Sequence, residues 1–495
     1  MRIPHQEQLQ LDATPIARIT LDTECRDRMI PILRGLQHLY SQSHVRDQAL
    51  ELIALDVLED ADPTQGREGL TLWQVFVLAS VRLGTNITYD HLHYLAGNDR
   101  NLRAMMQVGE WSEESFAWHR IRDNICQVRI ETIEKINQLV VEEGHRLHSE
   151  AAEYVRGDTF VAETNVHYPT ESGLIFDGLT KICDLAPQLA EMINCDGWRQ
   201  SKSLLKKSKR AARAIGRVKK AGRGYKQRLQ AAYEGLFHYV DILLPRLESL
   251  LEQALGNLPY DADGLLPSSE ASALYQQLIY WHSVTEHVRG TAYRRVVLGE
   301  SVPNADKLFS LFEPDTELIK RGKAGSPIEF GHKVMVIEDA VGFICHWKVL
   351  PIGADERDML IPELTVLQER LRHRIERASF DRGFHSPENQ AALARIIPHP
   401  CLPKPGVRQA AEQQASATVE FHKSRRQHSG IESAIGALQS GNGLARCRDH
   451  SQAGYARYIG LGILGRNVLL LGKLLLAAEH PQCAAAISCR GEAAA

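Results

Sequence analysis

The sequence predicts an α/β protein whose mixed β-sheet is interrupted by a long helical segment. An apolar, β-prone run at 155–161 is typical of a buried strand. Helical periodicity then extends over 179–319. Strand character returns at 334–338 and 342–350, two apolar runs joined by a short turn that is typical of a hairpin. The helical segment is therefore expected as an insertion between two strands of one sheet.

Residues 1–150 are predicted to form a helical N-terminal region. Roughly the first 20 residues are polar and contain two prolines, so we expect a loose arm there. From Cys25 to about Asp60, apolar side chains recur every three or four residues, as in a helix. A polar break at 60–66 comes next. Further helices are expected at 70–83, from Thr88 and within 115–148.

Turn residues divide the helical segment into four expected helices. They are placed at 179–195, 201–221, 225–255 and 270–288. Gly222 and Gly224 interrupt the chain after the second of these, but this glycine pair is too short for a phosphate-binding loop. Trp198 and Trp281 also lie in the segment. We interpret both as core residues, with stacking on an unpaired base as the alternative.

Beyond the hairpin, helices and short strands are expected to alternate. A helix is predicted at 361–374 and a strand at 377–380. Ser386 and the proline after it are typical of a helix start. A last strand is expected at 396–397, a mobile loop at 403–414 and a further helix from Ser429.

The apolar run 459–478 contains Arg466 and Lys473, which favours a buried amphipathic helix over a membrane span. Nine scattered cysteines without a CxxC pair indicate a reducing cytosol and no structural zinc. The N-terminal residues show no signal-peptide pattern, so we expect a cytoplasmic protein.

Positive charge is concentrated in one part of the chain. Residues 199–228 hold 13 Lys or Arg and no acidic residue, and removing these 13 from the total of 58 leaves 45 cations against 61 acids elsewhere. The island includes Lys206, Lys207, Lys209, Arg210, Arg213, Arg217, Lys219 and Lys220. Such an island favours contact with a nucleic-acid backbone, and an ordinary solvated helix is the alternative.

Three carboxylates stand out because of where they occur. Asp158 lies within the first predicted strand, where a buried carboxylate must be paired, hydrogen-bonded or bound to a cation. Asp381 follows the strand at 377–380, and Glu432 lies in the late helix. Carboxylates from three separate elements could form a cage for a divalent metal ion.

Each of these acids also has a structural interpretation. Asp158 could be a turn residue at a strand end, and Asp381 could be a turn aspartate or form a local salt bridge. Glu432 follows Ser429 by three residues, which is the pattern of a helix-capping box. Further candidate metal ligands are Glu163 and Asp177.

Four segments together form a recognisable series. They read GDTFVAETNVHYPTESGLIFDG from 157, GHKVMVIEDAVGFICHWKV from 331, FDRGFHS from 380 and HSGIESAIGAL from 428. In this order they resemble the DDE transposases of bacterial insertion sequences, and the resemblance covers roughly residues 20–470. The chain most resembles the IS4, IS5 and IS1182 groups and their ungrouped relatives.

The resemblance implies an RNase H-like catalytic domain formed by 151–178 and 326–445. It implies that the helical region 1–150 helps to bind the DNA ends of the element and to form a dimer, whereas a generic helical bundle is the alternative. The α-helical insertion after the first catalytic strand would be 179–325. Residues 446–495 would form a C-terminal helix and a loose tail.

The resemblance also implies the chemistry. Asp158 would bridge two Mg²⁺ ions, Asp381 would hold one and Glu432 the other, and Mn²⁺ would substitute. Where many IS4-like relatives carry a tyrosine, an arginine, the glutamate and a lysine, this chain has Arg425, His428, Glu432 and Gln439. The phosphate contacts of those relatives therefore do not carry over residue by residue.

Other side chains near the motif acids are candidates for contact with DNA phosphate. They are Arg425, Arg426 and His428, with a solvated basic face as the alternative. His167 and His385 lie beside the motif acids in the sequence, and they could contact phosphate or support the site.

The expected function is that of a DNA transposase. It would bind the terminal inverted repeats of its element and target DNA, as a homodimer or larger synaptic complex, in the bacterial cytoplasm at the nucleoid and without a membrane. Two alternatives remain open: an RNase H-like nuclease without strand transfer, and a domesticated transposase that only binds DNA.

Overall fold

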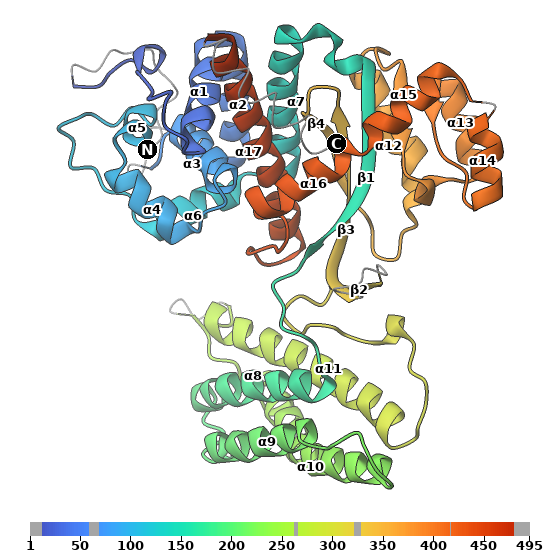
Figure 1. Cartoon of the computed structure of the whole chain (residues 1–495). Helices are drawn as coiled ribbons and strands as arrows, with labels where there is room; N and C mark the ends of the chain where they lie inside the picture. Colours follow the sequence, from blue (N-terminus) through green and yellow to red (C-terminus); the bar gives the residue numbers. More distant parts are fainter. Residues whose placement is uncertain (1–11, 59–68, 262–265, 321–327, 416, 480–495) are drawn as a thin grey trace. The chain divides into compact units, whose positions relative to one another are not determined.

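The computed structural model describes residues 12–58, 69–261, 266–320, 328–415 and 417–479 (Figure 1). The protein is a mixed α/β chain that divides into two compact units. Unit 1 comprises residues up to Asn165 and from Gly331 onward, and unit 2 comprises Val166–Phe330.

The described residues form one mixed sheet of six strands. The strands are β1 (Tyr154–Glu163), β2 (Glu317–Lys320), β3 (Ile328–Asp339), β4 (Ile344–Val349), β5 (Arg377–Phe380) and β6 (His399–Cys401). Their order is β2-β3-β1-β5-β6, with β4 also paired to β3. β3 runs antiparallel to β1 and to β4, whereas β5 runs parallel to β1 and β6 runs parallel to β5. The expected α/β class and mixed sheet are therefore confirmed.

The predicted hairpin is present and is longer than expected on its first strand. β3 extends over Ile328–Asp339, and the turn that follows includes Gly342 with φ +113°, a value that favours glycine. Asp339 fixes this turn, because its Oδ1 accepts hydrogen bonds from the backbone N–H groups of Val341, Gly342 and Phe343 at 2.8–3.0 Å.

The N-terminal part of unit 1 is helical, as predicted, but its first helix is divided at Gln42. Its helices are α1 (Met29–Ser41), α2 (Ser43–Val57), α3 (Leu72–Gly84), α4 (Tyr89–Asn98), α5 (Arg100–Met105), α6 (Trp118–Gln127) and α7 (Ile130–Leu147), with short 3-10 turns at Ile16–Arg18 and Ser149–Glu153. The expected break at 60–66 lies outside the described residues.

The loose arm is wrong for the residues around Ile16. Ile16 and Ile19 are buried, and the Gln37 side-chain amide donates hydrogen bonds to both of their carbonyl oxygens. Burying two large aliphatic side chains offsets the entropy lost by ordering this short segment. Residues 1–11 lie outside the described part of the chain.

Helix α17 (Gln452–Glu479) is the central helix of unit 1 and packs on α1, α3 and α7. Its length and composition would allow it to cross a membrane, but 72% of its apolar window is buried inside the protein. Gly465 and Gly472 let the backbones of α3 and α1 approach closely, because a Cβ at either position would meet backbone atoms. The expected buried helix is therefore confirmed.

Unit 2 contains the helices expected between the first strand and the hairpin, and the first of them begins earlier than the sequence indicates. Its helices are α8 (Glu171–Met192), α9 (Ser201–Gly216), α10 (Tyr225–Ala254) and α11 (Ser269–Val296), with a 3-10 turn at Asn304–Asp306. Thr170 caps α8 by accepting the Gly173 N–H, which explains the earlier start. Trp198 and Trp281 are buried core residues. The helical expectation is wrong at 317–319, which belongs to β2.

Two expectations in the C-terminal half are also wrong. Residues 396–397 end helix α13 rather than forming a strand, and the strand lies at β6. Pro400 is tolerated there because β6 is an edge strand. The expected loop at 403–414 contains helix α14, whose alanine, glutamine and glutamate residues are good helix formers. The helices here are α12 (Glu356–Arg370), α13 (Pro387–Ile396), α14 (Val407–Ala415), α15 (Val419–His428) and α16 (Gly430–Gly441), with a 3-10 turn at Arg382–Phe384.

Candidate functional site

Asp158 on β1 and Asp381, the residue that follows the parallel strand β5, lie next to each other. In the register of β1 and β5, Gly157 is opposite Phe380, so Asp158 and Asp381 are the next residues along the two chains. Asp381 retains extended backbone angles (φ −71°, ψ 161°). Neighbouring strands lie about 4.8 Å apart, so the backbones of the two residues are close together. Asp158 is half-buried and Asp381 is exposed.

Glu432 lies on α16, which packs on β1, where the Gln439 side chain donates a hydrogen bond to the carbonyl oxygen of Val161 at 3.2 Å. The capping-box interpretation of Glu432 is wrong. Ser429 has helical backbone angles, and its hydroxyl donates to the Arg426 carbonyl oxygen instead of capping α16. The Glu432 side chain is exposed and has no hydrogen-bonding or ionic partner among the described residues.

His428, the last residue of α15, lies close enough to Asp381 and Glu432 to feel both of their charges. Ser379 and the His428 ring nitrogen Nδ1 are hydrogen-bonded at 3.2 Å, and Ser379 lies on β5 two residues before Asp381. Burial lowers the pKa of His428 below its usual range, while the negative charges of Asp381 and Glu432 act to raise it. Both carboxylates are therefore close enough to act on the same imidazole.

The three carboxylates are adjacent but do not form a compact cluster. Among the described residues, the one group of three or more His, Cys, Asp and Glu ligand atoms within 4.8 Å of one another is His145, Asp339 and Cys345. A two-ion site needs more room, because ions about 4 Å apart, each about 2 Å from its ligands, spread the outer ligands over about 8 Å. Hard carboxylate oxygens from three elements, two of them exposed, fit Mg²⁺.

The interpretation as a turn residue is wrong for Asp158 and is confirmed for Asp381. Asp158 lies within β1 and not at a strand end, so the turn interpretation is wrong, although its Oδ1 accepts the N–H of Thr159 at 2.7 Å. Asp381 does serve as a turn aspartate, because its Oδ1 accepts the Arg382 N–H at 2.7 Å. For exposed Asp381, this hydrogen bond to one oxygen is compatible with metal binding through the other.

The other candidate ligands are paired elsewhere. Glu163 is five residues from Asp158 on the same strand, so the two side chains point to opposite faces, and Glu163 lies 3.7 Å from Arg446. In unit 2, Asp177 pairs with His167 at 3.5 Å, and burial raises the pKa of Asp177. In unit 1, His385 is hydrogen-bonded to Gln390 at 3.0 Å.

The last turn of α15 presents cations beside the acidic group. Arg425 and Arg426 are exposed, and neither makes an ion pair within the described part of the chain. They precede His428, which contacts Ser379. Exposed, unpaired guanidinium groups can bind phosphate bidentately, so these two arginines are available for such a contact.

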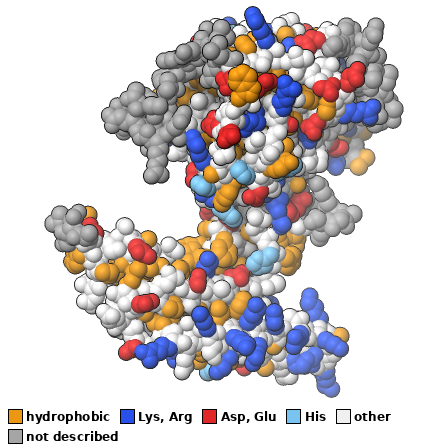
Figure 2. All heavy atoms as spheres, turned by 90° about the vertical axis from the view of Figure 1, so that its left-hand side faces the viewer, with side chains coloured by type: hydrophobic (Ala, Val, Ile, Leu, Met, Phe, Trp, Pro, Cys, Tyr) orange, Lys and Arg blue, Asp and Glu red, His pale blue; other side chains and the backbone are white. Residues whose placement is uncertain are grey.

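The basic island forms most of helix α9 in unit 2. Figure 2 shows Lys and Arg side chains gathered on the lower part of this unit. Ser201, Leu204, Ser208 and Ile215 face the core of unit 2. All eight named cations of the island are exposed, and none makes an ion pair within the described residues. Lys219 and Lys220 lie beyond Gly216, where α9 ends.

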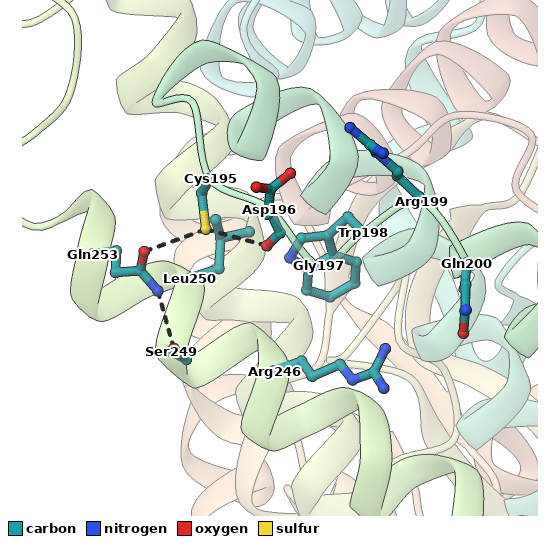
Figure 3. Close-up of a pocket in the computed structure, with 10 residues that line it drawn as sticks. All are labelled: Cys195, Asp196, Gly197, Trp198, Arg199, Gln200, Arg246, Ser249, Leu250 and Gln253. Atoms are coloured by element: carbon teal, nitrogen blue, oxygen red, sulfur yellow. Dashed lines mark hydrogen bonds between the residues drawn. The ribbon is translucent and has the colours of Figure 1, made fainter.

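A cavity of about 390 Å³ lies in unit 2 between the 195–200 loop and helix α10 (Figure 3). The Cys195 thiol donates to the Gln253 side-chain oxygen and to the Asp196 carbonyl oxygen, both at 3.4 Å. Asp196 is the single carboxylate that lines the cavity. The cavity therefore does not hold a set of carboxylates that could bind Mg²⁺.

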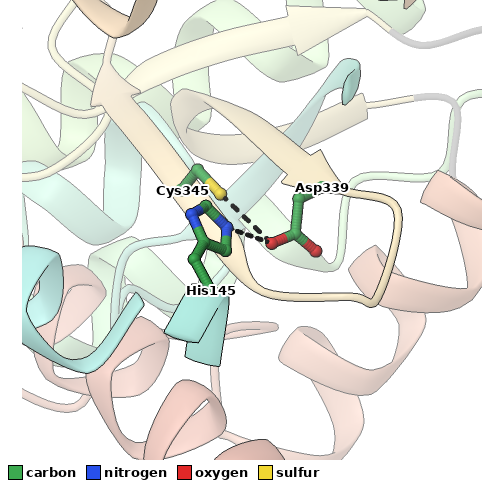
Figure 4. A group of neighbouring side chains, drawn as sticks. All are labelled: His145, Asp339 and Cys345. Atoms are coloured by element: carbon green, nitrogen blue, oxygen red, sulfur yellow. Dashed lines mark hydrogen bonds and ion pairs between the residues drawn. The ribbon is translucent and has the colours of Figure 1, made fainter. Parts of the chain in front are cut away.

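His145, Asp339 and Cys345 form a second, fully buried group in unit 1 (Figure 4). The Asp339 Oδ2 lies 2.9 Å from His145 Nε2 and accepts from the Cys345 thiol at 3.6 Å. Burial and the Asp339 charge raise the pKa of Cys345 well above its usual range, so the thiol keeps its proton. Nitrogen and sulfur donors do not suit Mg²⁺. Sequence reasoning missed this group, although Asp339 at the end of an apolar strand was a signal for it.

Comparisons with protein-family models, with curated proteins and with solved structures find no match for this chain. The assignment of function therefore depends on the geometry described above and on the sequence motifs.

Proposed function

We propose that the chain is a metal-dependent enzyme that cleaves and rejoins phosphodiester bonds. More specifically, we infer a DDE-type transposase of a bacterial insertion sequence, with an RNase H-like catalytic domain. The observation that carries the proposal is the placement of Asp158 on β1 beside Asp381, which directly follows the adjacent parallel strand β5, with Glu432 on the helix that packs on β1. The order of the elements supports the proposal as well. A strand is followed by the helical segment, by a hairpin, and then by helices and strands in alternation.

The proposed chemistry needs little from the protein besides charge and position. Mg²⁺ or Mn²⁺, when bound, would stabilise the attacking and leaving oxygens of an in-line displacement. Asp158 would contact both ions, Asp381 one and Glu432 the other. Neutral His428 is hydrogen-bonded to Ser379, and this contact holds the junction between α15 and α16 in place. Glu432 lies on α16. Arg425 and Arg426 would hold phosphate oxygens beside the reacting bond.

The partner would be double-stranded DNA, both the terminal inverted repeats and the target. Helix α9 supports this choice, because exposed cations without ionic partners bind the DNA backbone by releasing counterions. The helical N-terminal region would help to recognise the ends. Two ends must be handled together, so a homodimer or larger synaptic complex would act, in the bacterial cytoplasm at the nucleoid.

Two other functions use the same structure. A nuclease without strand transfer needs the same three acids, and no observation favours it over the transposase. A protein that only binds DNA would not need Asp158, Asp381 and Glu432 on adjoining elements, so their adjacency disfavours it. Short inverted repeats and target duplications flanking the encoding gene would favour the transposase over both.

The test is cleavage and joining of DNA that carries the sequences flanking the encoding gene. In Mg²⁺ we expect wild-type protein to cleave these ends and join them to a target plasmid. Asp158→Asn should fold and bind the same DNA but lose both reactions, because an amide is a far weaker metal ligand than a carboxylate.

Glu163→Gln is the matched control, because it removes one carboxylate from the opposite face of the same strand. It should keep cleavage and joining. Full activity of Asp158→Asn, or equal loss in both variants, would contradict the proposed site. Cleavage without joining would favour the nuclease.

A further inference from the structure

Four cations from three elements form a row beside the acidic group in unit 1. They are Arg156 on β1, Arg466 and Lys473 on α17, and Arg28 at the start of α1. Arg156 binds Glu338 Oε2 with Nε and Nη2, both at 2.7 Å, and Arg466 Nη2 lies 3.5 Å from Glu338 Oε1. We call these four residues the cation row.

Two residues of the row lie on a solvent-facing stripe of the largely buried helix α17. Arg466, Leu470 and Lys473 recur at helical spacing on α17, and Lys473 reaches solvent. Lys473 lies seven positions after Arg466, which is about 10 Å along the helix axis. The backbone of Gly472 approaches that of Pro31 on α1, so Arg28, three residues before Pro31, lies near the Lys473 end.

The cation row lacks negative charge. Glu338 is the one carboxylate that the described part of the chain pairs with any of its members, so four cations face one acid. The Nε of Arg466 is buried without a hydrogen-bond acceptor, and Lys473 has no partner among the described residues. Arg28 donates to the Gly441 carbonyl oxygen at 2.7 Å, a contact that leaves its charge uncompensated.

Burial lowers the pKa of Arg28, Arg466 and Lys473 below their usual ranges, and neighbouring cations of the row lower each of them further. For Arg466, Glu338 acts in the opposite direction and raises the pKa. A partly buried cation without a counterion costs free energy, and a bound anion would relieve that cost.

We propose that the cation row is a phosphate-binding site that holds the DNA strand next to the reacting phosphodiester. Guanidinium groups suit phosphate because they bind two of its oxygens at once. The row begins at Arg156, whose charge acts on the same His428 as those of Asp381 and Glu432. The choice of DNA as the source of phosphate rests on the proposed function, whereas the anion site rests on four neighbouring cations that share one carboxylate.

The test compares two double variants with the same loss of charge. Arg28→Gln/Lys473→Gln removes the solvent-facing end of the row and leaves Asp158, Asp381 and Glu432 unchanged. Lys135→Gln/Arg395→Gln removes two exposed cations of unit 1 that have no partner among the described residues. DNA binding is measured in EDTA over a range of salt concentrations, and thermal unfolding is measured with added inorganic phosphate.

We expect the row variant to bind DNA more weakly. The slope of the logarithm of the binding constant against the logarithm of the salt concentration should become less steep by about 1.8, which is twice the value of 0.9 for each phosphate contact. Inorganic phosphate should raise the unfolding temperature of wild type and of the control variant more than that of the row variant. Equal behaviour of the two double variants in both measurements would overturn the site. A lost phosphate effect with unchanged DNA binding would overturn DNA as the source and indicate free phosphate.

These results are separable from the proposed activity because EDTA prevents metal-dependent cleavage. A protein that never cleaves DNA, yet binds it through the row, would overturn the proposed activity and leave the inference standing. A fully active row variant with an unchanged salt dependence would overturn the inference and leave the activity standing.

Discussion

Unit 1 contains two groups of potential metal ligands that differ in almost every physical respect. His145, Asp339 and Cys345 are compact and fully buried, and Asp339 accepts three backbone hydrogen bonds in addition to its side-chain contacts. Asp158, Asp381 and Glu432 are spread over three elements, and two of the three are exposed.

Compactness alone selects the first group, but its hydrogen-bonding capacity is already used within the protein. A buried polar network whose members are satisfied stabilises a fold and specifies one packing arrangement. In the second group, the carboxylates of Asp381 and Glu432 are exposed to solvent. Open carboxylates are what metal binding and access of a substrate require. The comparison teaches that solvent-exposed carboxylates, more than closely spaced ligand atoms, indicate where a metal ion and a substrate can bind.

The largest expected effect is the loss of activity in Asp381→Asn. A metal ion contributes several kcal/mol to transition-state stabilisation, so the rate of cleavage should fall by at least about ten thousandfold. The unfolding temperature should stay near that of wild type, because Asp381 is exposed. Single-turnover cleavage in Mg²⁺ measures the rate. Asp177→Asn in unit 2 serves as a control that should keep the rate.

Asp339→Asn should instead destabilise unit 1 strongly. Breaking a buried pair costs about 3 kcal/mol or more, and here the loss includes the contact to His145 and charge-assisted bonds to the hairpin turn. Thermal unfolding measures this change. Cys345→Ser is the milder variant, since it keeps a donor to Asp339. If Asp339→Asn were as stable as wild type, the group would not be the structural anchor that we describe.

Replacing Lys206, Lys207, Lys209 and Arg210 with Gln should weaken binding to DNA of every sequence. Four lost phosphate contacts would flatten the logarithmic salt dependence by about 3.6. The unfolding temperature should change little, because these side chains are exposed and have no ionic partner among the described residues. An unchanged salt dependence would make α9 an ordinary solvated helix.

The smallest expected effect concerns the pH dependence of stability at His428. Burial lowers its folded-state pKa, so between that pKa and the usual value near 6.5 the unfolded chain binds more protons than the folded chain. Stability should therefore rise with pH through this window and be lost as the pH falls. His428→Asn keeps an acceptor for Ser379 but cannot titrate, so thermal unfolding from pH 5 to 8 should show a weaker dependence. If the stability of His428→Asn depended on pH as strongly as that of wild type, His428 would not be the source of the dependence.

Local patterns predicted most elements because they combine burial periodicity with clear end signals. The hairpin β3–β4 and the start of α13 at Ser386 are examples. The prediction of a strand at 396–397 is wrong because a two-residue apolar run does not determine which strand it would pair with. The actual strand, β6, is fixed by pairing with β5, a contact between distant segments. Helix α14 was missed because no apolar periodicity marks an exposed helix.

For the candidate site, the sequence predicted the acids but not their surroundings. The cation row joins residues 28, 156, 466 and 473, and only tertiary packing brings them together. The capping-box prediction for Glu432 failed for a local reason. Ser429 continues from α15 with helical backbone angles, so the free N-terminus that a capping box requires does not exist there.

Binding of Mn²⁺ to the protein, followed by the electron paramagnetic resonance of the free ion, tests the central claim most directly. In the presence of DNA we expect wild type to bind Mn²⁺, Asp158→Asn and Asp381→Asn to bind it much more weakly, and Cys345→Ser to bind it as wild type does. Binding that survives both aspartate substitutions but is lost in Cys345→Ser would contradict the account and move the metal site to the buried group.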